Sequence, residues 1–454
     1  MKIGRKILFA LALVAALGAA AFAQDTPAAP VEPAKTEMPS TPAAGAAPEL
    51  NIEEPAAPAS IPDRAVDANV FRRTPVIDGS VKDGEWDTYE MATSYQTYID
   101  WDFKHLYFAL RSADVPGNFY VVIDAKNDGW YRGDDNYILA FTVEENGTHL
   151  KSVRFYKTGD GYSPASMVTS EDHAKLINSV SKKDDGIYTL EISVPVGIFP
   201  GFKSFKSGMV MGIDLTKSLR TDGTVERPSE CTLVTKKVAG MGNLDLDFAI
   251  ADDMIARGDT LEAKFVMKNK GGEDAAVSGV VIAGEGLSEN FISSRKSVYN
   301  SLKSGKKAVE SIKSVIPQNM PLGAWAVGAE VLSGDQRLGA GIMSFEVVEP
   351  FDLDTVLPVK DVTSDSNEIT VKVKVKNYRR SKLYGTAKLV MPEGWECAAA
   401  EKKFTVSSKG SAVSVAFKVK PPLGVVGKVP VKFTVTADDV TKEVEGSFNV
   451  VAPK

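Results

Sequence analysis

The sequence predicts an all-β protein made of several sandwiches, and two observations carry that prediction. From Asp63 onward, apolar and polar residues alternate with a period of two, as in Tyr95–Trp101 and Tyr188–Val194, and helical periodicity is nearly absent. Turn dipeptides such as Asn146-Gly147 and Asp185-Gly186 separate these runs and tolerate the positive φ of tight hairpins. Many short strands with regular turns are typical of a β-sandwich.

The first expected element is a secretory signal peptide over residues 1–23. Three basic residues within positions 2–6 precede an apolar run over 7–20, and Ala21-Phe22-Ala23 offers small residues for cleavage. The run is shorter than the roughly 18 residues that a spanning helix needs, and no later run matches it, so we expect no membrane span in the mature chain. We therefore expect a protein exported through the secretory pathway, to a periplasm or to the outside of the cell.

Residues 24–62 form an Ala- and Pro-rich segment with almost no aromatic residue. Such a composition buries too little apolar surface to offset the entropy of ordering, so we predict a disordered linker that acts as a spacer. The chain beyond it is too long for one core. We expect a β-sandwich over 63–240 and two immunoglobulin-like sandwiches over 244–349 and 350–454.

Alternation predicts five further strands in the first sandwich, which cover Leu106–Ser112, Phe119–Asp124, Tyr137–Glu144, His149–Phe155 and Met209–Leu215. The two later blocks resemble diverged copies of each other. Glu262–Lys270 and Thr370–Tyr378 are alternating strands that both carry Lys-Asn toward their ends, at an offset of 108 residues. This spacing indicates an internal duplication.

Composition and motifs disfavour several classes of function. The net charge is −6 and the basic residues are spread along the strands, which is not the footprint of a protein that binds nucleic acid. The three histidines have no zinc spacing, and no nucleophile elbow, phosphate loop or dinucleotide glycine pattern follows a strand. We therefore expect a protein that is not an enzyme.

One stretch of the first block resembles a known family. The segments Pro75–Gly79, Asp83–Trp86 and Trp101–Phe108 resemble the start of a family 9 carbohydrate-binding module, within the wider DOMON-like group, and the resemblance covers Asp63–Lys237. The resemblance implies a β-sandwich that binds polysaccharide or cell-envelope glycan, with tryptophans that clamp a terminal sugar.

The third block carries a second resemblance. Met391–Trp395, Lys403–Val406 and the pair Pro421-Pro422 resemble the small immunoglobulin-like domain that is appended to alpha-galactosidases and other glycosidases. This resemblance implies a protein that acts beside a glycoside hydrolase in carbohydrate catabolism.

A sugar site combines flat aromatic rings with side chains that hydrogen-bond hydroxyl groups, and the first block is rich in both. Trp86 follows a turn and is expected in the core. Trp101 ends a strand between Asp100 and Asp102, which suggests a place at the rim of the sandwich. The residues that we assign to the sugar site are Trp101, Trp130, Tyr98, Asp102, Arg111 and Asn136.

The loop that follows Asp124 echoes a calcium loop, with Asp128 fifth, Gly129 sixth and Asp135 twelfth. It departs from that pattern because Lys126 occupies the third position and strands flank the loop. The candidate calcium ligands are Asp124, Asp128, Asp134 and Asp135. The alternative is an ordinary loop in which these side chains cap their own backbone.

Two other functions stay open at this stage. The first is a structural or interaction protein of the cell envelope, in which the sandwich has lost its sugar site. The second is electron transfer, because some DOMON-like relatives hold a b-type heme between methionine and histidine or lysine. The candidate axial ligands are His105, His149, Met209 and Met211.

Overall fold

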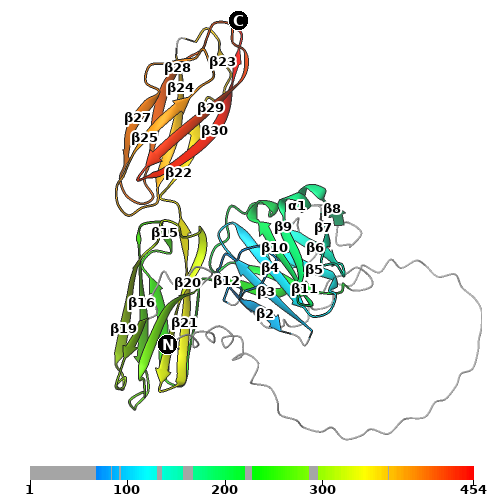
Figure 1. Ribbon diagram of the computed structural model, residues 1–454, viewed down its shortest axis with the longest axis vertical. Helices are drawn as coiled ribbons and strands as arrows, with labels where there is room; N and C mark the ends of the chain where they lie inside the picture. Colours follow the sequence, from blue (N-terminus) through cyan, green and yellow to red (C-terminus); the bar gives the residue numbers. More distant parts are fainter. Residues whose placement is uncertain are drawn as a thin grey trace, which may run out of the picture.

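A computed structural model describes residues 68–82, 84–91, 94–129, 135–156, 167–219, 228–285, 295–366 and 368–453. Over these residues the chain is nearly all β-structure, and the prediction of an all-β fold with several sandwiches is confirmed. Figure 1 shows three packed units, each built around its own large hydrophobic cluster. The expected signal peptide and linker lie outside the described residues.

The first sandwich has two sheets. Its strands are β1 (Ala68–Phe71), β2 (Thr88–Met91), β3 (Tyr95–Trp101), β4 (His105–Ser112), β5 (Gly117–Asp124), β6 (Asn136–Val143), β7 (His149–Tyr156), β8 (Met167–Thr169), β9 (Asn178–Asp184), β10 (Ile187–Pro195), β11 (Val210–Thr216) and β12 (Ser229–Val234). One sheet has the order β1-β12-β11-β5-β6-β7-β8 and the other the order β2-β3-β4-β10-β9. The core lies between them.

Helical structure is minor in the first sandwich. The helix α1 (Glu171–Leu176) has Ser170 as its N-cap, whose side chain accepts a hydrogen bond from the backbone N–H of His173. A short 3-10 turn covers Val196–Ile198. In the described part of the chain, no helix combines the length and the apolar character that crossing a membrane requires.

The second sandwich contains β13 (Lys236–Gly240), β14 (Leu244–Ile250), β15 (Met254–Ala256), β16 (Thr260–Asn269), β17 (Gly279–Glu285), β18 (Arg295–Val298), β19 (Lys307–Val315), β20 (Gly323–Ser333) and β21 (Gln336–Val348). Its sheets have the orders β13-β21-β20-β17-β18, with β15 also paired to β21, and β14-β16-β19. Although β13 lies within the range predicted for the first sandwich, it pairs antiparallel with β21. Its hydrogen bonds to β21 therefore place it in the second sandwich.

The third sandwich contains β22 (Phe351–Val356), β23 (Val362–Thr363), β24 (Ile369–Asn377), β25 (Leu383–Val390), β26 (Glu396–Cys397), β27 (Glu401–Val406), β28 (Ala412–Lys420), β29 (Gly427–Ala437) and β30 (Val440–Val451). Its sheets have the orders β22-β24-β28-β26 and β23-β30-β29-β25-β27. On β24 the apolar residues are buried and the lysines point outward, as the alternation predicts.

A buried asparagine ends the matching strand in the second and third sandwiches. The amide of Asn269 donates to the carbonyls of Glu273 and Leu302, at 2.7 and 3.0 Å. The amide of Asn377 makes the same kind of contact with the carbonyls of Ser381 and of Ser407, at 2.8 and 3.3 Å. In both cases the side-chain oxygen accepts the backbone N–H two residues further on. This shared network supports the duplication inferred from the sequence.

Arg72 joins the first sandwich to the second. Its side chain is fully buried, its Nε donates to the hydroxyl of Ser344 and its Nη2 donates to the carbonyl of the same residue, both at 3.0 Å. The guanidinium lies 4.9 Å from the ring of Phe103. Nearby, Thr74 and Ala324 exchange two hydrogen bonds, at 3.1 and 2.8 Å. The first sandwich is thereby fixed against the side of the second.

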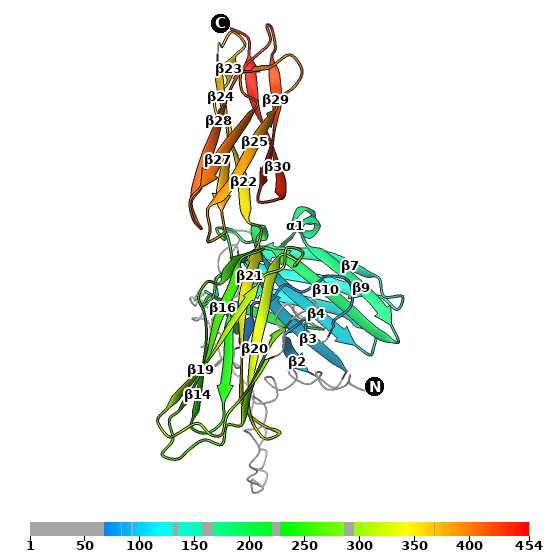
Figure 2. The same cartoon turned by 60° about the vertical axis from the view of Figure 1, so that its left-hand side comes forward.

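The third sandwich continues from the end of the second, as Figures 1 and 2 show. Asp259 accepts hydrogen bonds from the Nε of Arg379 and from the backbone N–H of Arg380, at 3.3 and 2.9 Å. The ammonium of Lys409 contacts the carboxylate of Asp252. Because these charged groups are partly buried, they restrict the angle between the two sandwiches.

Glu346 of β21 lies close to the junction between the first and second sandwiches. Burial, and then the charge of Asp102, raise the pKa of Glu346 to about 8, although Arg72 acts in the opposite direction. Its ordinary pKa is 4.5. A carboxyl whose pKa is higher in the folded than in the unfolded protein contributes fully to the free energy of unfolding at a pH below its unfolded pKa. That contribution is lost as the pH rises through the pKa of the folded protein. The junction is therefore expected to weaken between pH 4.5 and about 8.

We predict that Glu346→Gln flattens this pH dependence, because glutamine stays neutral where the glutamate is forced to ionise. The free energy of unfolding of the variant should match the parent near pH 5 and exceed it near pH 8, as measured by urea unfolding over that range. Glu273→Gln, on the exposed surface of the same sandwich, is the matched control. Parallel pH profiles of the parent and Glu346→Gln would contradict the prediction.

Candidate functional site

The outward face of the five-stranded sheet carries several of the residues assigned to sugar binding. Successive residues of a strand point to opposite faces, and Ile99 and Trp101 of β3 pack in the core. Gln96 and Tyr98 therefore point outward. The register places Gln96 opposite Arg111 of β4, so these two side chains lie next to each other on the outward face.

The turn segment 76–82 covers part of this outward face, and two buried carboxylates hold it in place. Glu191 of β10 accepts hydrogen bonds from the backbone N–H groups of Asp78 and Gly79, at 2.8 and 2.6 Å. Glu85 accepts another from the start of the segment, at 2.8 Å. Burial raises the pKa of both carboxyl groups. The segment thus covers the middle of this face, whereas Arg111 at one end of β4 is exposed.

The prediction that Trp101 lies at the rim and stacks on a sugar is wrong. Its side chain is 0% exposed and belongs to the core of the first sandwich. Its indole N–H donates to the carbonyl of Val70 at 3.0 Å, and the guanidinium of Arg72 lies 5.9 Å from its ring. A ring with both faces packed cannot receive a pyranose. Trp86 is also buried, as expected for a core residue.

Asp102 does not face solvent either. One of its carboxylate oxygens accepts the backbone N–H groups of Lys104 and His105, at 2.7 and 2.8 Å, and the other accepts the hydroxyls of Thr74 and Tyr107. Burial acts to raise the pKa of Asp102, but the hydrogen bonds from His105 and Tyr107 outweigh burial and lower it. Asp102 therefore caps a turn instead of binding a hydroxyl group of a ligand.

The remaining assigned residues are dispersed. Tyr98 is 7% exposed, and its hydroxyl donates to the amide oxygen of Gln96 at 2.7 Å. Asn136 is fully buried at the start of β6, in the other sheet. Trp130 lies outside the described residues. Of the assigned set, Arg111 alone is both described and exposed.

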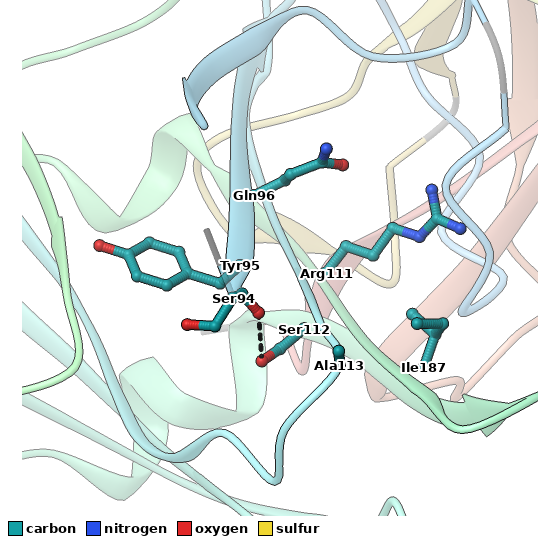
Figure 3. Close-up of a pocket in the computed structure, with 7 residues that line it drawn as sticks. All are labelled: Ser94, Tyr95, Gln96, Arg111, Ser112, Ala113 and Ile187. Carbon is teal, nitrogen blue, oxygen red and sulfur yellow. Dashed lines mark hydrogen bonds between the residues drawn. The ribbon is translucent and has the colours of Figure 1, made fainter. Parts of the chain in front are cut away.

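A concave pocket of about 190 Å³ opens beside Arg111. Its lining residues are Ser94, Tyr95, Gln96, Arg111, Ser112, Ala113 and Ile187. Figure 3 shows Gln96 and Arg111 on one side of their strands, whereas the ring of Tyr95 points to the other side. Because Tyr98 occupies the amide oxygen of Gln96, the amide nitrogen remains available to a ligand. Within the described part of the chain, Arg111 has no hydrogen bond or ion pair.

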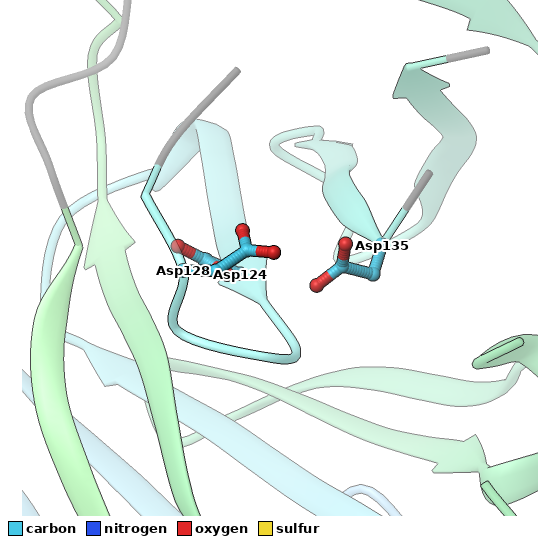
Figure 4. Close-up of side chains that lie close together, drawn as sticks. All are labelled: Asp124, Asp128 and Asp135. Carbon is cyan, nitrogen blue, oxygen red and sulfur yellow. The ribbon is translucent and has the colours of Figure 1, made fainter. Parts of the chain in front are cut away.

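Three of the predicted calcium ligands do come together. One carboxylate oxygen from each of Asp124, Asp128 and Asp135 lies within 4.8 Å of the other two (Figure 4). Asp124 ends β5 and Asp135 directly precedes β6. Burial is the main cause that raises the pKa of Asp124 and of Asp135. Asp134 lies outside the described residues.

The contacts and positions of three of the residues considered for heme argue against heme ligation by them. Both ring nitrogens of His149 are hydrogen-bonded, to the hydroxyls of Ser181 and Ser179 at 2.8 and 2.9 Å. Met211 is buried in the core, whereas His105 lies on the outward side of β4. An axial pair has to face a common cavity, and His105 and Met211 lie on opposite sides of the sheet that contains β4.

Comparison with known proteins gives little information about the function of the site. No family model and no curated protein matches the chain. Among solved structures, a red sea bream transglutaminase matches with 12% identity over 74% of this chain and 57% of its own length, at a TM-score of 0.29. This chain thus spans little more than half of that protein.

Two further matches are similarly distant. A CARDB domain from Pyrococcus furiosus, in complex with di-metal ions, has 13% identity over 24% of this chain and 97% of its own length, at a TM-score of 0.18. An Escherichia coli alpha-2-macroglobulin has 9% identity over 81% of this chain and 44% of its own length, at a TM-score of 0.23. Similarity at this level carries no functional argument.

We predict that Trp101→Ala destabilises the protein by roughly 3–5 kcal/mol, because it removes a fully buried ring and an indole hydrogen bond and leaves a cavity. Thermal and urea unfolding measure the effect. Leu150→Ala, a change at a residue of the same sandwich that is 68% exposed, should stay within about 0.5 kcal/mol. A variant with parental stability would return Trp101 to the list of ligand-binding residues.

Proposed function

We propose that the protein is an exported, non-catalytic carbohydrate-binding protein that docks on a glycan through the pocket beside Arg111. One observation carries the proposal: an exposed guanidinium that has no hydrogen bond or ion pair among the described residues lies next to an amide nitrogen in a concave part of the first sandwich. Planar donors of this kind can bridge neighbouring oxygens of a sugar. The resemblance to family 9 carbohydrate-binding modules supports the same class of ligand.

The chemistry of the pocket favours an acidic sugar. Arg111 offers only donors, and Gln96 has its amide nitrogen left, so both groups match an acceptor. Among the described residues that line the pocket, none carries a carboxylate. A uronic acid supplies a carboxylate that a guanidinium can bind through two parallel hydrogen bonds.

The size of the pocket implies weak binding of a single sugar ring. Sites for drug-sized ligands enclose roughly 300–1,000 Å³, which is more than this pocket provides. The ring of Tyr95 points away from Gln96 and Arg111, so stacking contributes little here. We expect dissociation constants of about micromolar or weaker, with retention that depends on many copies of the sugar along a polysaccharide.

In this proposal the second and third sandwiches act as a rigid spacer that holds the first sandwich toward its ligand. The contacts of Arg72 with Ser344, and of Arg379 with Asp259, restrict motion at the two junctions. A glycoside hydrolase is the partner suggested by the resemblance of the third block. In this proposal the chain supplies attachment to the polysaccharide, and the enzyme supplies cleavage.

A structural role in the cell envelope is the second candidate, and the burial of the tryptophans favours it. Trp86 and Trp101 are closed to any ligand, so the first sandwich lacks the tryptophan clamp that the family resemblance implies among its described residues. The same rigid junctions would then serve to space other components. The two candidates differ in whether the pocket beside Arg111 binds saccharide.

We predict that Arg111→Ala abolishes retention on an acidic polysaccharide such as a polygalacturonate, and leaves stability within about 0.5 kcal/mol, because the side chain is exposed and makes no hydrogen bond or ion pair within the described residues. Affinity electrophoresis and a glycan array measure the binding. Lys175→Ala removes one exposed positive charge from the same sandwich and is the matched control.

The outcomes separate the two candidates. Loss of binding in Arg111→Ala, with binding intact in Lys175→Ala, supports the sugar site. Binding of neutral glycans that survives the change at Arg111 would place a sugar site elsewhere on the protein. If the parent protein binds no glycan on the array, the structural role is favoured.

A further inference from the structure

The acidic cluster of the first sandwich stands apart from the sugar pocket. It belongs to the hairpin of β5 and β6, in which Asp124 pairs with Asn136 in register. The pocket beside Arg111 lies on the opposite sheet. Asp135 is held toward Asp124 because its carbonyl accepts the backbone N–H of Ala125 at 3.0 Å. The end of the hairpin next to its connecting loop thus brings these carboxylates together.

Asp124 has one carboxylate oxygen that lacks a partner. The residue is 0% exposed, and its Oδ2 accepts the backbone N–H of Gly129 at 3.0 Å. Its Oδ1 is buried and has no hydrogen-bond partner among the described residues. A buried acceptor that is left unsatisfied is costly. The end of β5 therefore holds a buried oxygen that requires either a proton or a cation.

Asp124 lies directly opposite Gly212 of the neighbouring strand β11. A Cβ placed on Gly212 of the neighbouring strand β11 would lie only 3.0 Å from the Cβ of Asp124. The absence of a side chain at Gly212 therefore leaves room for the side chain of Asp124. Figure 4 shows the carboxylate of Asp124 between those of Asp128 and Asp135, so the buried carboxylate faces the cluster.

We propose that Asp124, Asp128 and Asp135 bind a calcium ion. Calcium takes oxygen ligands at about 2.3–2.6 Å, so two ligands of one ion stand at most about 5 Å apart. The mutual distances of the three carboxylate oxygens, within 4.8 Å, meet that limit. Calcium also accepts irregular coordination and carbonyl or water ligands, whereas magnesium demands a tighter octahedron. The ion satisfies the buried oxygen and neutralises the repulsion between the three carboxylates.

In this proposal the ammonium group of Lys126 supplies the positive charge beside the carboxylates when no calcium is bound. Its ammonium lies 3.4 Å from one oxygen of Asp135, while its backbone N–H donates to the other oxygen at 2.7 Å. The lysine side chain is 45% exposed, so it can leave the cluster without a large loss of packing. Binding of calcium therefore displaces the ammonium into solvent while the backbone contact remains.

The test uses the full chain, stripped of metal with a chelator and then titrated with calcium chloride. Isothermal titration calorimetry should give one site, and saturating calcium should raise the melting temperature of the first sandwich by about 4 °C or more. Asp128→Asn, at an exposed ligand whose loss does not threaten folding, should weaken binding at least tenfold. Asp172→Asn, a change at an exposed aspartate of the same sandwich, should bind as the parent does.

Lys126→Met tests the displacement step. Removal of the competing ammonium should tighten calcium binding by several-fold, and an unchanged or weaker affinity would overturn this part of the proposal. If the metal-free protein is folded and shows neither heat nor a change in melting temperature with calcium, a proton satisfies Asp124 and the site is refuted. A magnesium response as strong as the calcium response would refute the choice of metal.

Discussion

The buried guanidinium of Arg72 is the contact on which the arrangement of the first two sandwiches depends. A buried charge is costly unless its donors are satisfied, and here Ser344 accepts two of them while Asp253 lies 3.5 Å away. The same guanidinium covers Phe103 and lies near Trp101. The end of β3 is therefore part of a junction between sandwiches, and it cannot serve as the open rim of a sugar site.

The strands were predictable because a sheet with one buried and one exposed face requires apolar and polar residues to alternate along each strand. The pattern over Tyr95–Trp101 gives the bounds of β3 to the residue, and the Lys-Asn pairs mark the ends of β16 and β24. β9 has no such signal, since its sequence is mostly polar and its residues are at least partly exposed at the edge of a sheet. β13 could not be assigned from sequence, because only its pairing with β21 decides which sandwich contains it.

The site was harder to predict because a carboxylate beside a tryptophan has more than one role. Asp100 and Asp102 suggested an exposed rim, but both are buried and accept backbone N–H groups, from Asp87 in the first case and from Lys104 and His105 in the second. The pocket beside Arg111 depends on the register between β3 and β4, which sequence does not supply. The acidic loop was easier, because its ligands are close together in sequence.

The first sandwich separates two opposite kinds of chemistry by placing them on different sheets. On one sheet, Arg111 and Gln96 present hydrogen-bond donors toward solvent, which suits an anion. On the other, Asp124 and its neighbours present oxygens at the end of a hairpin, which suits a cation. The hydrophobic core lies between the sheets. Because the two sites share no residue and no hydrogen bond among the described contacts, a cation in the loop can influence the pocket only through the stability of the sandwich.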